Sequence, residues 1–145
     1  MTVVLGRWSS SMGRRRYVLD TICSGCYNVR VWDIEVTDQF VEWWDGLTAE
    51  EQDPIEAAID VLEQRGPSLG RPLVDGITGS RHANMKELRP GTTRVLFAFD
   101  PKRTAILLIG GDKRDRWQAF YAEMIPIADD LLDEHLAELE GKGAT

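Results

Sequence analysis

The stretch "NMKELRPGTTRVLFAFDPKRTAILLIGG", Asn84 to Gly111, contains three apolar runs separated by turn signals. The runs NMKEL, RVLFAFD and TAILLIGG are short and rich in β-branched, aromatic and other apolar residues, which is typical of strands. The segment DPKR between the last two runs has the composition of a turn. The stretch therefore predicts a meander of three strands at the centre of the domain.

The residues before this meander predict one strand and two helices. Val29–Val36 (VRVWDIEV) alternates in part and is expected to be a strand. Thr37 is a good N-cap for a helix that carries DQFVEWWDGL. Thr48 and Glu51 have the spacing of a capping box for a second helix, which is expected to stop at Gly66. The following segment, 67–82, is rich in turn residues and is predicted to be irregular.

After the meander, residues 117–139 return to a helical pattern that contains Pro126, which is expected to kink or split the helix. The fold class is thus α+β: strand–helix–helix, then a small, mostly antiparallel sheet and a C-terminal helical segment. We expect the helices to cover one face of the sheet. Residues 1–28 lack periodicity and are predicted to be a flexible basic N-terminal extension, with the domain in 29–145.

The composition favours one compact domain in the cytoplasm. The chain has 145 residues, of which 43% are hydrophobic, and it contains no apolar run of the roughly 20 residues that span a membrane. Cys23 and Cys26 form a C-x-x-C pair without a second pair, whereas a structural zinc site needs four ligands. We therefore predict neither a metal site nor a cofactor.

The charge is distributed unevenly along the chain. The net charge is -7, yet residues 81–118 hold nine lysines and arginines against four acids. Clustered positive charge in a fold is the footprint expected for a phosphate-bearing partner. The alternative is a solvated hairpin whose bases pair with acids on neighbouring helices. Charge alone favours that alternative, because most surface charges have no binding role.

Strand alternation places Arg94, Leu96 and Ala98 on one face of the sheet, and Val95, Phe97 and Phe99 on the other. As the first residue of its strand, Arg94 is expected to be accessible and replaceable without loss of the fold. The antiparallel return brings Lys113 close to it. These two bases are expected to form a cationic site with neighbouring bases and aromatic residues, namely Lys86, Arg89, Trp117 and Tyr121. Arginine binds phosphate in a bidentate manner, and aromatic rings stack on bases.

With these residues in view, the sequence resembles the phage-derived HigB-like branch of the RelE/ParE toxin superfamily. The motifs that carry the resemblance are "ELR", "RVLFAFDPKR", and "LLIGGDK" followed by an aromatic pair and "MIPIADDLLDEHL". The resemblance covers roughly residues 31–139. It implies the toxin of a type II toxin–antitoxin system, most simply an endoribonuclease that cuts messenger RNA on the ribosome with the RNA 2′-hydroxyl as nucleophile and without a metal.

The resemblance also assigns roles. Arg94 corresponds to the phosphate-binding arginine, Lys113 to a second basic residue, and Tyr121 lies near the C-terminal tyrosine. Arg89 and His82 complete the catalytic candidates. The RNA-binding candidates are Lys86, Arg89, Arg94, Arg103, Lys113, Arg114 and Trp117. Where the best-studied RelE proteins have a lysine, this chain has Glu87, as is usual in HigB-like relatives, and Glu87 is either the general base or a residue that orients Arg89 or Arg94.

Two alternatives to the nuclease stay open: a ParE-like inhibitor of DNA gyrase, and an inactive remnant that binds its antitoxin and co-represses transcription. The expected partners are a helix-turn-helix antitoxin (HigA-like), the ribosome and messenger RNA. The antitoxin is expected to mask the basic face or the C-terminal helix. That helix has an apolar stripe at Leu131, Leu132, Leu136 and Leu139, which either binds the antitoxin or packs on the protein's own sheet.

Overall fold

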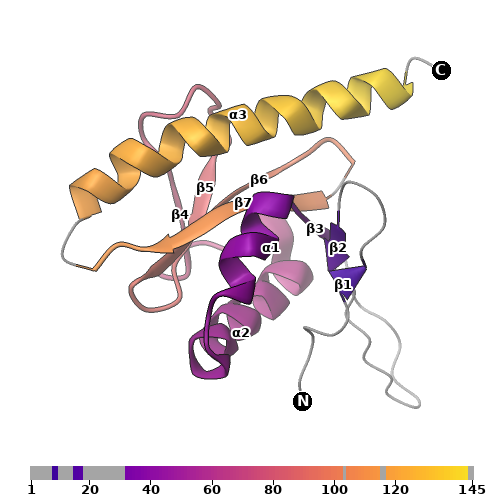
Figure 1. The fold of residues 1–145 in the computed structure, drawn as a ribbon. Helices are drawn as coiled ribbons and strands as arrows, with labels where there is room; N and C mark the ends of the chain where they lie inside the picture. Colours follow the sequence, from indigo (N-terminus) through magenta and orange to yellow (C-terminus); the bar gives the residue numbers. More distant parts are fainter. Residues whose placement is uncertain (1–7, 10–14, 18–31, 103, 115–116, 144–145) are drawn as a thin grey trace, which may run out of the picture.

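A computed structural model describes residues 8–9, 15–17, 32–102, 104–114 and 117–143 (Figure 1). These ranges contain three helices, seven strands and one 3-10 turn. In chain order they are β1 (Trp8–Ser9), β2 (Arg15–Tyr17), β3 (Asp33–Val36), α1 (Asp38–Asp45), α2 (Ala49–Arg65), the 3-10 turn Gly66–Ser68, β4 (Val74–Gly76), β5 (Lys86–Leu88), β6 (Thr93–Phe99), β7 (Thr104–Asp112) and α3 (Trp117–Gly143). The predicted α+β class is confirmed.

The strands form one sheet in the order β1-β2-β3-β7-β6-β5-β4 (Figure 1). Of the strand pairs described, β3 and β7 run parallel and the others antiparallel. The parallel pair is joined through the α1–α2 hairpin and the strands that follow it, as a parallel connection requires. The predicted meander is therefore present as β5, β6 and β7, and β4 extends it at the edge.

Both predicted helix starts are confirmed. The Thr37 side chain accepts a hydrogen bond from the backbone N–H of Phe40 (3.0 Å) at the start of α1. Thr48 and Glu51 form the reciprocal capping box of α2, with donor–acceptor distances of 2.9 and 3.1 Å. These side chains satisfy backbone donors that the first turn of a helix leaves unpaired.

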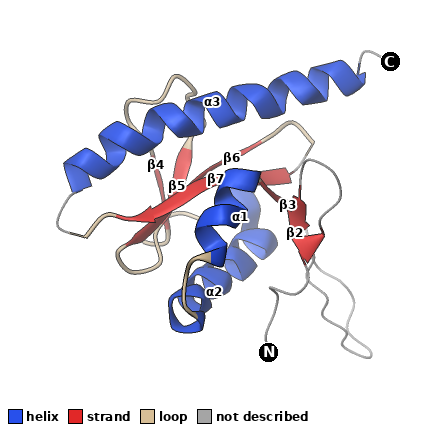
Figure 2. Cartoon of the chain, viewed as in Figure 1, coloured by secondary structure: helices blue, strands red, loops and turns tan. Residues whose placement is uncertain are grey.

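The helices cover both faces of the sheet, so the prediction of helices on one face is wrong. α1 and α2 lie on one side and α3 on the other (Figure 2). Val95 and Phe97 belong to the core under α1 and α2. Leu96 and Ala98 belong to a second core under α3. Because β6 and β7 are apolar at nearly every position, each face needs its own cover.

Two adjacent glycines near the end of β7 allow both helical layers to reach the same piece of backbone. A Cβ atom on Gly110 would lie 2.3 Å from Cζ3 of Trp43 in α1. A Cβ atom on Gly111 would lie 2.7 Å from Cε2 of Phe120 in α3. Both distances are shorter than real contacts allow, so the two aromatic rings occupy the places of the missing side chains.

α3 is a single helix from Trp117 to Gly143, and Pro126 lies inside it. Of the two predicted effects of Pro126, a kink or a split, the split is therefore wrong and the kink stays a prediction. The leucine stripe is mostly internal: Leu131 and Leu132 are buried in the core under α3 and Leu136 packs against it. Of the two alternatives for this stripe, packing on the protein's own sheet is correct. None of the helices in the described ranges is long and apolar enough to cross a membrane.

Three sequence predictions concern residues that the structure does not describe. The C-x-x-C pair Cys23 and Cys26 lies outside the described residues, as does the predicted start of the first strand at residues 29–31. Within the predicted extension 1–28, the described segments are β1 and β2, and β2 pairs with β3. The boundary at residue 28 remains a prediction.

Candidate functional site

Arg94, at the beginning of β6, is the centre of the candidate site. Its guanidinium Nη1 donates hydrogen bonds to the backbone carbonyls of Gly91 (2.6 Å) and Thr93 (2.8 Å). The residue is only 5% exposed, so the prediction of an accessible arginine is wrong, whereas its replacement without loss of the fold stays a prediction. Arg94 is therefore a fixed positive charge within the fold.

Glu87 of β5 lies on the same face as Arg94. In the sheet register Glu87 is opposite Leu96, which belongs to the core under α3. Its Oε1 lies 3.7 Å from Nε of Arg94, and its Oε2 lies 3.8 Å from Nε of Arg89. Nε of Arg94 is buried without a hydrogen-bond partner within 3.5 Å among the described residues. Glu87 is 6% exposed, so two guanidinium groups compensate the charge of a buried carboxylate.

Tyr121 of α3 completes the cluster from the other side. Its hydroxyl donates a hydrogen bond of 2.6 Å to Oε1 of Glu87. Burial raises the pKa of the Tyr121 hydroxyl, and the hydrogen bond to Glu87 and its negative charge raise it further. Tyr121 is thus a neutral donor at physiological pH. It follows Phe120, the residue whose ring sits against Gly111, so the glycine allows the tyrosine to reach Glu87.

Arg89 has a second carboxylate partner in Asp75 of β4, which the sequence analysis did not predict as a site residue. Nη1 of Arg89 lies 3.2 Å from Oδ2 of Asp75. The same oxygen lies 3.1 Å from Nη2 of Arg71. The hydrogen bond from Arg71 lowers the pKa of Asp75, and the backbone N–H of Gly76 lowers it as well. In the sequence, Asp75 is a single acid in the segment 67–82, which is predicted to be irregular, so the pattern does not indicate a contact with Arg89.

Lys113 lies next to Arg94 across the β6–β7 pair, as predicted. Gly111 is directly opposite Arg94, and the backbone N–H of Lys113 donates to the carbonyl of Thr92 (3.1 Å). Lys113 is therefore the diagonal neighbour of Arg94, about 7–8 Å away between Cα atoms. The neighbouring Arg114 pairs with Asp112 at 2.9 Å.

Trp117 begins α3 and is one of the large apolar side chains on the surface. It is 56% exposed, and its ring meets that of Tyr121 edge to face at 6.5 Å between centroids. A planar ring in this position is available to stack on a base.

The structure does not bring the remaining candidates to this cluster. Lys86 lies on the opposite face of the sheet, with Nζ 5.9 Å from the centroid of the Phe99 ring. His82 contacts Asp133 of α3 at 2.8 Å. Asp133 lies about 18 Å from Tyr121 along the helix, at a rise of 1.5 Å per residue. Arg103 lies outside the described residues.

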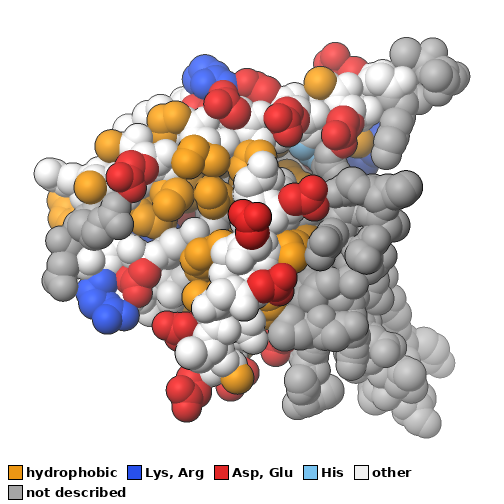
Figure 3. Space-filling view, in the orientation of Figure 1, with side chains coloured by type: hydrophobic (Ala, Val, Ile, Leu, Met, Phe, Trp, Pro, Cys, Tyr) orange, Lys and Arg blue, Asp and Glu red, His pale blue; other side chains and the backbone are white. Residues whose placement is uncertain are grey.

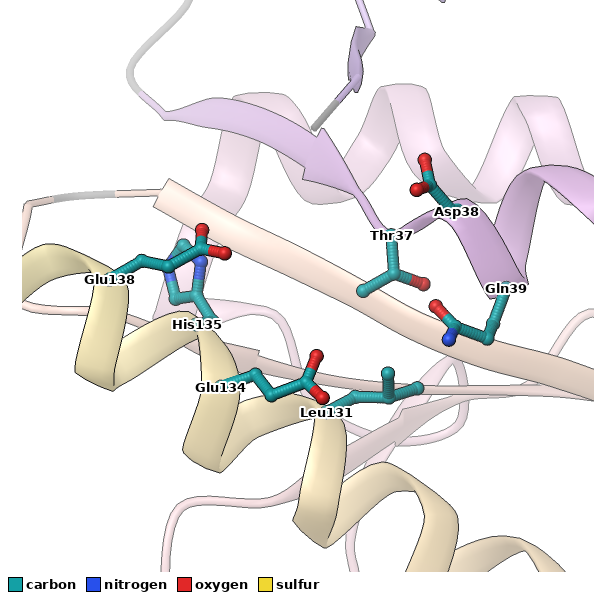
Figure 4. A pocket seen from close by; sticks show the side chains of 7 residues that line it. All are labelled: Thr37, Asp38, Gln39, Leu131, Glu134, His135 and Glu138. Atoms are coloured by element: carbon teal, nitrogen blue, oxygen red, sulfur yellow. The ribbon is translucent and has the colours of Figure 1, made fainter. Parts of the chain in front are cut away.

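Acidic side chains dominate the face shown in Figure 3, where they gather over α3 and around α1 and α2. On that face a cleft of about 180 Å³ opens between the start of α1 and the C-terminal half of α3. It is lined by Thr37, Asp38, Gln39, Leu131, Glu134, His135 and Glu138 (Figure 4). Behind it, the buried His135 contacts Asp100 at 2.7 Å. The cleft shares no residue with the cluster of Glu87, Arg94 and Tyr121, and the two are separate features.

Chemically, the cluster combines a carboxylate, a neutral phenol and two guanidinium groups within hydrogen-bonding or ion-pair distance. Such a set can accept and pass a proton through Tyr121 and Glu87. It can also stabilise negative charge that develops on a phosphate, because arginines are preorganised donors for phosphate oxygens.

Comparison with known sequences supports a family assignment. Residues 42–133 match the model of a family described as phage derived protein Gp49-like. The chain is 50% identical over 114 residues to the predicted toxin HigB2 of Mycobacterium tuberculosis, a match that covers 75% of this chain and 56% of HigB2. It is 49% identical over 107 residues to the predicted toxin HigB3 of the same organism, which covers 72% of this chain and 94% of HigB3. The chain thus spans little more than half the length of HigB2 and nearly all of HigB3.

Among solved structures, the toxin–antitoxin complex of RelE and RelB from Pyrococcus horikoshii matches with a TM-score of 0.48 and 17% identity, over 59% of this chain and 98% of that chain. The RelBE2 toxin–antitoxin complex of M. tuberculosis matches with a TM-score of 0.46 and 17% identity, over 58% of this chain and 99% of that chain.

Proposed function

The chain belongs to the phage-derived Gp49-like family and is 49% identical to the predicted toxin HigB3, and we propose that it is a HigB-like toxin of the RelE/ParE superfamily that cuts messenger RNA on the ribosome. The single observation that supports this activity most strongly is the contact of Glu87 with both Tyr121 and Arg94. In this contact a carboxylate, a phenol and a guanidinium lie together, and these groups suit the proposed roles of proton acceptor, proton donor and phosphate-binding group.

In the proposed reaction, the RNA 2′-oxygen attacks the adjacent phosphorus. The 2′-hydroxyl gives its proton to the oxygen of Tyr121, while the phenol proton moves along the 2.6 Å hydrogen bond to Glu87. The new O2′–P bond forms as the P–O5′ bond breaks, and the leaving 5′-oxygen takes a proton from water. The products are a 2′,3′-cyclic phosphate and a 5′-hydroxyl, and Glu87 then returns its proton to water.

Negative charge grows on the non-bridging phosphate oxygens during this step. Arg94 and Lys113 stabilise it, with Arg89 as a third cation. The backbone carbonyls that hold Arg94 keep its guanidinium in place before the substrate arrives, and such preorganisation is the main source of electrostatic catalysis. With a net charge of -7, the protein has little affinity for RNA in general, so the ribosome brings the substrate to the site.

The test is cleavage by purified protein on ribosomes programmed with a defined messenger RNA, with product ends mapped. We expect cuts in wild type and loss of cutting in Tyr121→Phe and Lys113→Ala. Arg65→Ala is a matched control, since Arg65 is exposed in the last turn of α2, on the layer opposite α3. Intact messenger RNA with the wild-type protein, on ribosomes that a control RelE-type nuclease cuts, would reject the nuclease.

One observation favours a toxin without RNA cleavage: Arg94 and Glu87 are 5% and 6% exposed. A buried ion pair that only stabilises the fold suits a ParE-like inhibitor of DNA gyrase or an antitoxin-binding co-repressor. Inducible expression distinguishes them. Growth arrest with intact messenger RNA and inhibited DNA supercoiling indicates the gyrase inhibitor, and normal growth indicates the co-repressor.

The proposed partner is a helix-turn-helix antitoxin of the HigA type, encoded next to this chain. Since Leu131 and Leu132 are buried, the leucine stripe is not its binding surface, and the basic face around Lys113 and Trp117 is the proposed one. Co-purification from native expression tests the partnership. If Trp117→Ala binds the antitoxin as wild type does, this face is not the interface.

A further inference from the structure

Two carboxylates face each other directly across the β4–β5 pair. In the register of these antiparallel strands, Asp75 is the partner of Glu87. Like charges directly opposite each other on neighbouring strands are normally destabilising. Here the guanidinium of Arg89 bridges them, with Nη1 3.2 Å from Oδ2 of Asp75 and Nε 3.8 Å from Oε2 of Glu87. Arg89 therefore offsets the repulsion between the two acids, alongside Arg94 next to Glu87 and Arg71 next to Asp75.

Asp75 is itself held in place from two other directions. The backbone N–H of Gly76 donates to its Oδ1 at 2.9 Å, and Arg71 contacts its Oδ2 at 3.1 Å. Arg71 is 77% exposed in its side chain, whereas Arg89 is 30% exposed. Of the two arginines, Arg89 is the less exposed one, and it contacts the buried Glu87 at 3.8 Å and the partly exposed Asp75 at 3.2 Å.

From this geometry we infer that Asp75 is a positioning residue: it fixes the guanidinium of Arg89 beside Glu87, at the end of β5 where RNA phosphate would bind. This inference rests on the proposed nuclease activity. Asp75 does not touch the substrate. It acts through Arg89, and it also keeps Arg89 from closing onto Glu87 as a direct hydrogen-bonded pair, which would withdraw Glu87 from the proton transfer.

The inference is tested by measuring how Asp75→Asn changes the cleavage rate with Arg89 present and with Arg89 replaced, because the two backgrounds should respond differently. In the wild-type background, Asp75→Asn should reduce the rate of cleavage on programmed ribosomes about tenfold, the scale of one lost coupling between neighbouring groups. In the Arg89→Ala background, Asp75 only repels Glu87, so Asp75→Asn should leave the rate unchanged or increase it. Asp75→Glu keeps the charge and should recover part of the loss.

Arg71→Ala is the matched control, because it removes the other arginine that contacts Asp75. We expect it to change the rate less than about twofold, as is usual for an exposed ion pair. Far-ultraviolet circular dichroism at the assay temperature confirms that each variant is folded.

The outcomes separate this inference from the proposed function. Full activity of Asp75→Asn would overturn the inference and leave the nuclease intact. The same fractional loss with and without Arg89 would also overturn it, because Asp75 would then act independently of Arg89. Absence of cleavage by the wild-type protein would overturn both.

Discussion

Replacing Arg94 by alanine is expected to damage stability and catalysis by two separable routes. The side chain is 5% exposed, donates two hydrogen bonds to backbone carbonyls, and lies 3.7 Å from Glu87. Removal leaves two carbonyls without this donor and a buried carboxylate without one of its two cations. The expected loss in free energy of unfolding is about 2–4 kcal/mol. Since domains have about 5–15 kcal/mol, the variant should remain folded at 25 °C.

The catalytic loss is measured on the same variant below its unfolding transition. If Arg94 stabilises the phosphate in the transition state, cleavage on programmed ribosomes should fall on the order of a hundred- to a thousandfold. A second substitution separates the two routes. Glu87→Gln keeps a hydrogen-bond acceptor for Tyr121 but removes the uncompensated charge, so Arg94→Ala/Glu87→Gln should recover most of the lost stability. The rate at which the double variant cleaves messenger RNA should stay as low as that of Arg94→Ala.

Urea unfolding at pH 7 and single-turnover cleavage are the two measurements. A change in unfolding free energy below about 0.5 kcal/mol, the range of ordinary surface substitutions, would refute the role of Arg94 in a buried ion pair. Full cleavage by folded Arg94→Ala would refute its catalytic role. Failure of Glu87→Gln to restore stability would show that the lost backbone hydrogen bonds, and not the charge of Glu87, cause the damage.

Three further predictions concern protonation, packing and the N-terminal segment. The pKa of the Tyr121 hydroxyl should lie above the ordinary tyrosine value of about 10, because burial and Glu87 raise it. The contribution of this shift to the free energy of unfolding is present below pH 10 and is lost as the pH rises through the pKa of the folded state. Subtracting the absorbance titration of Tyr121→Phe isolates the ionisation of Tyr121. Glu87→Gln should shift this ionisation to lower pH, and an unchanged curve would contradict the contact between Tyr121 and Glu87. Gly110→Ala should lower the free energy of unfolding, measured with urea, by about 1–3 kcal/mol, since its Cβ would lie 2.3 Å from the ring of Trp43. Adding Trp43→Leu should relieve that loss. Equal stability of Gly110→Ala and wild type would contradict the close packing of Trp43 on Gly110. Deletion of residues 1–28 should leave a cooperative thermal transition, because the core residues that the structure describes all come from Ile34 onwards. Loss of the transition would show that the pairing of β2 with β3 is needed for folding.

Local patterns predicted the elements of this fold well because their causes lie within a few residues. The caps at Thr37 and Thr48 each satisfy backbone groups three residues away. The alternation that separates Arg94 from Val95 is a property of any strand, and the two cores confirm it. The family, recognised from motifs between residues 84 and 139, is confirmed by the match over residues 42–133.

The wrong predictions concern relations between elements. The runs RVLFAFD and TAILLIGG already lacked a polar face, and this is the signal of a sheet covered on both sides. Pro126 does not split α3, because a single missing N–H is a local cost and the helix is held by the buried residues that follow it, Ala128, Leu131 and Leu132.

The candidate site was predicted in part for the same reason. Arg94 and Lys113 converge through a hairpin, which sequence spacing reveals. The contact of Tyr121 with Glu87 spans 34 residues and depends on how closely α3 approaches the sheet. Asp75 lies on a strand of three residues, too short for periodicity to identify, so its contact with Arg89 could not be predicted from the pattern.

The two glycines of β7 also restrict which substitutions relatives of this chain can accept. Each is replaceable only together with an aromatic residue on a different helix: Gly110 with Trp43 and Gly111 with Phe120. A homologue with a side chain at the first glycine is expected to have a small residue in place of the tryptophan, and one with a side chain at the second is expected to have lost the phenylalanine. In the second case α3 begins farther from the sheet and the tyrosine that follows no longer reaches Glu87. Joint substitution at positions 111 and 120 would therefore mark members of the family that lack the contact of this tyrosine with Glu87 and, with it, the proposed catalytic arrangement.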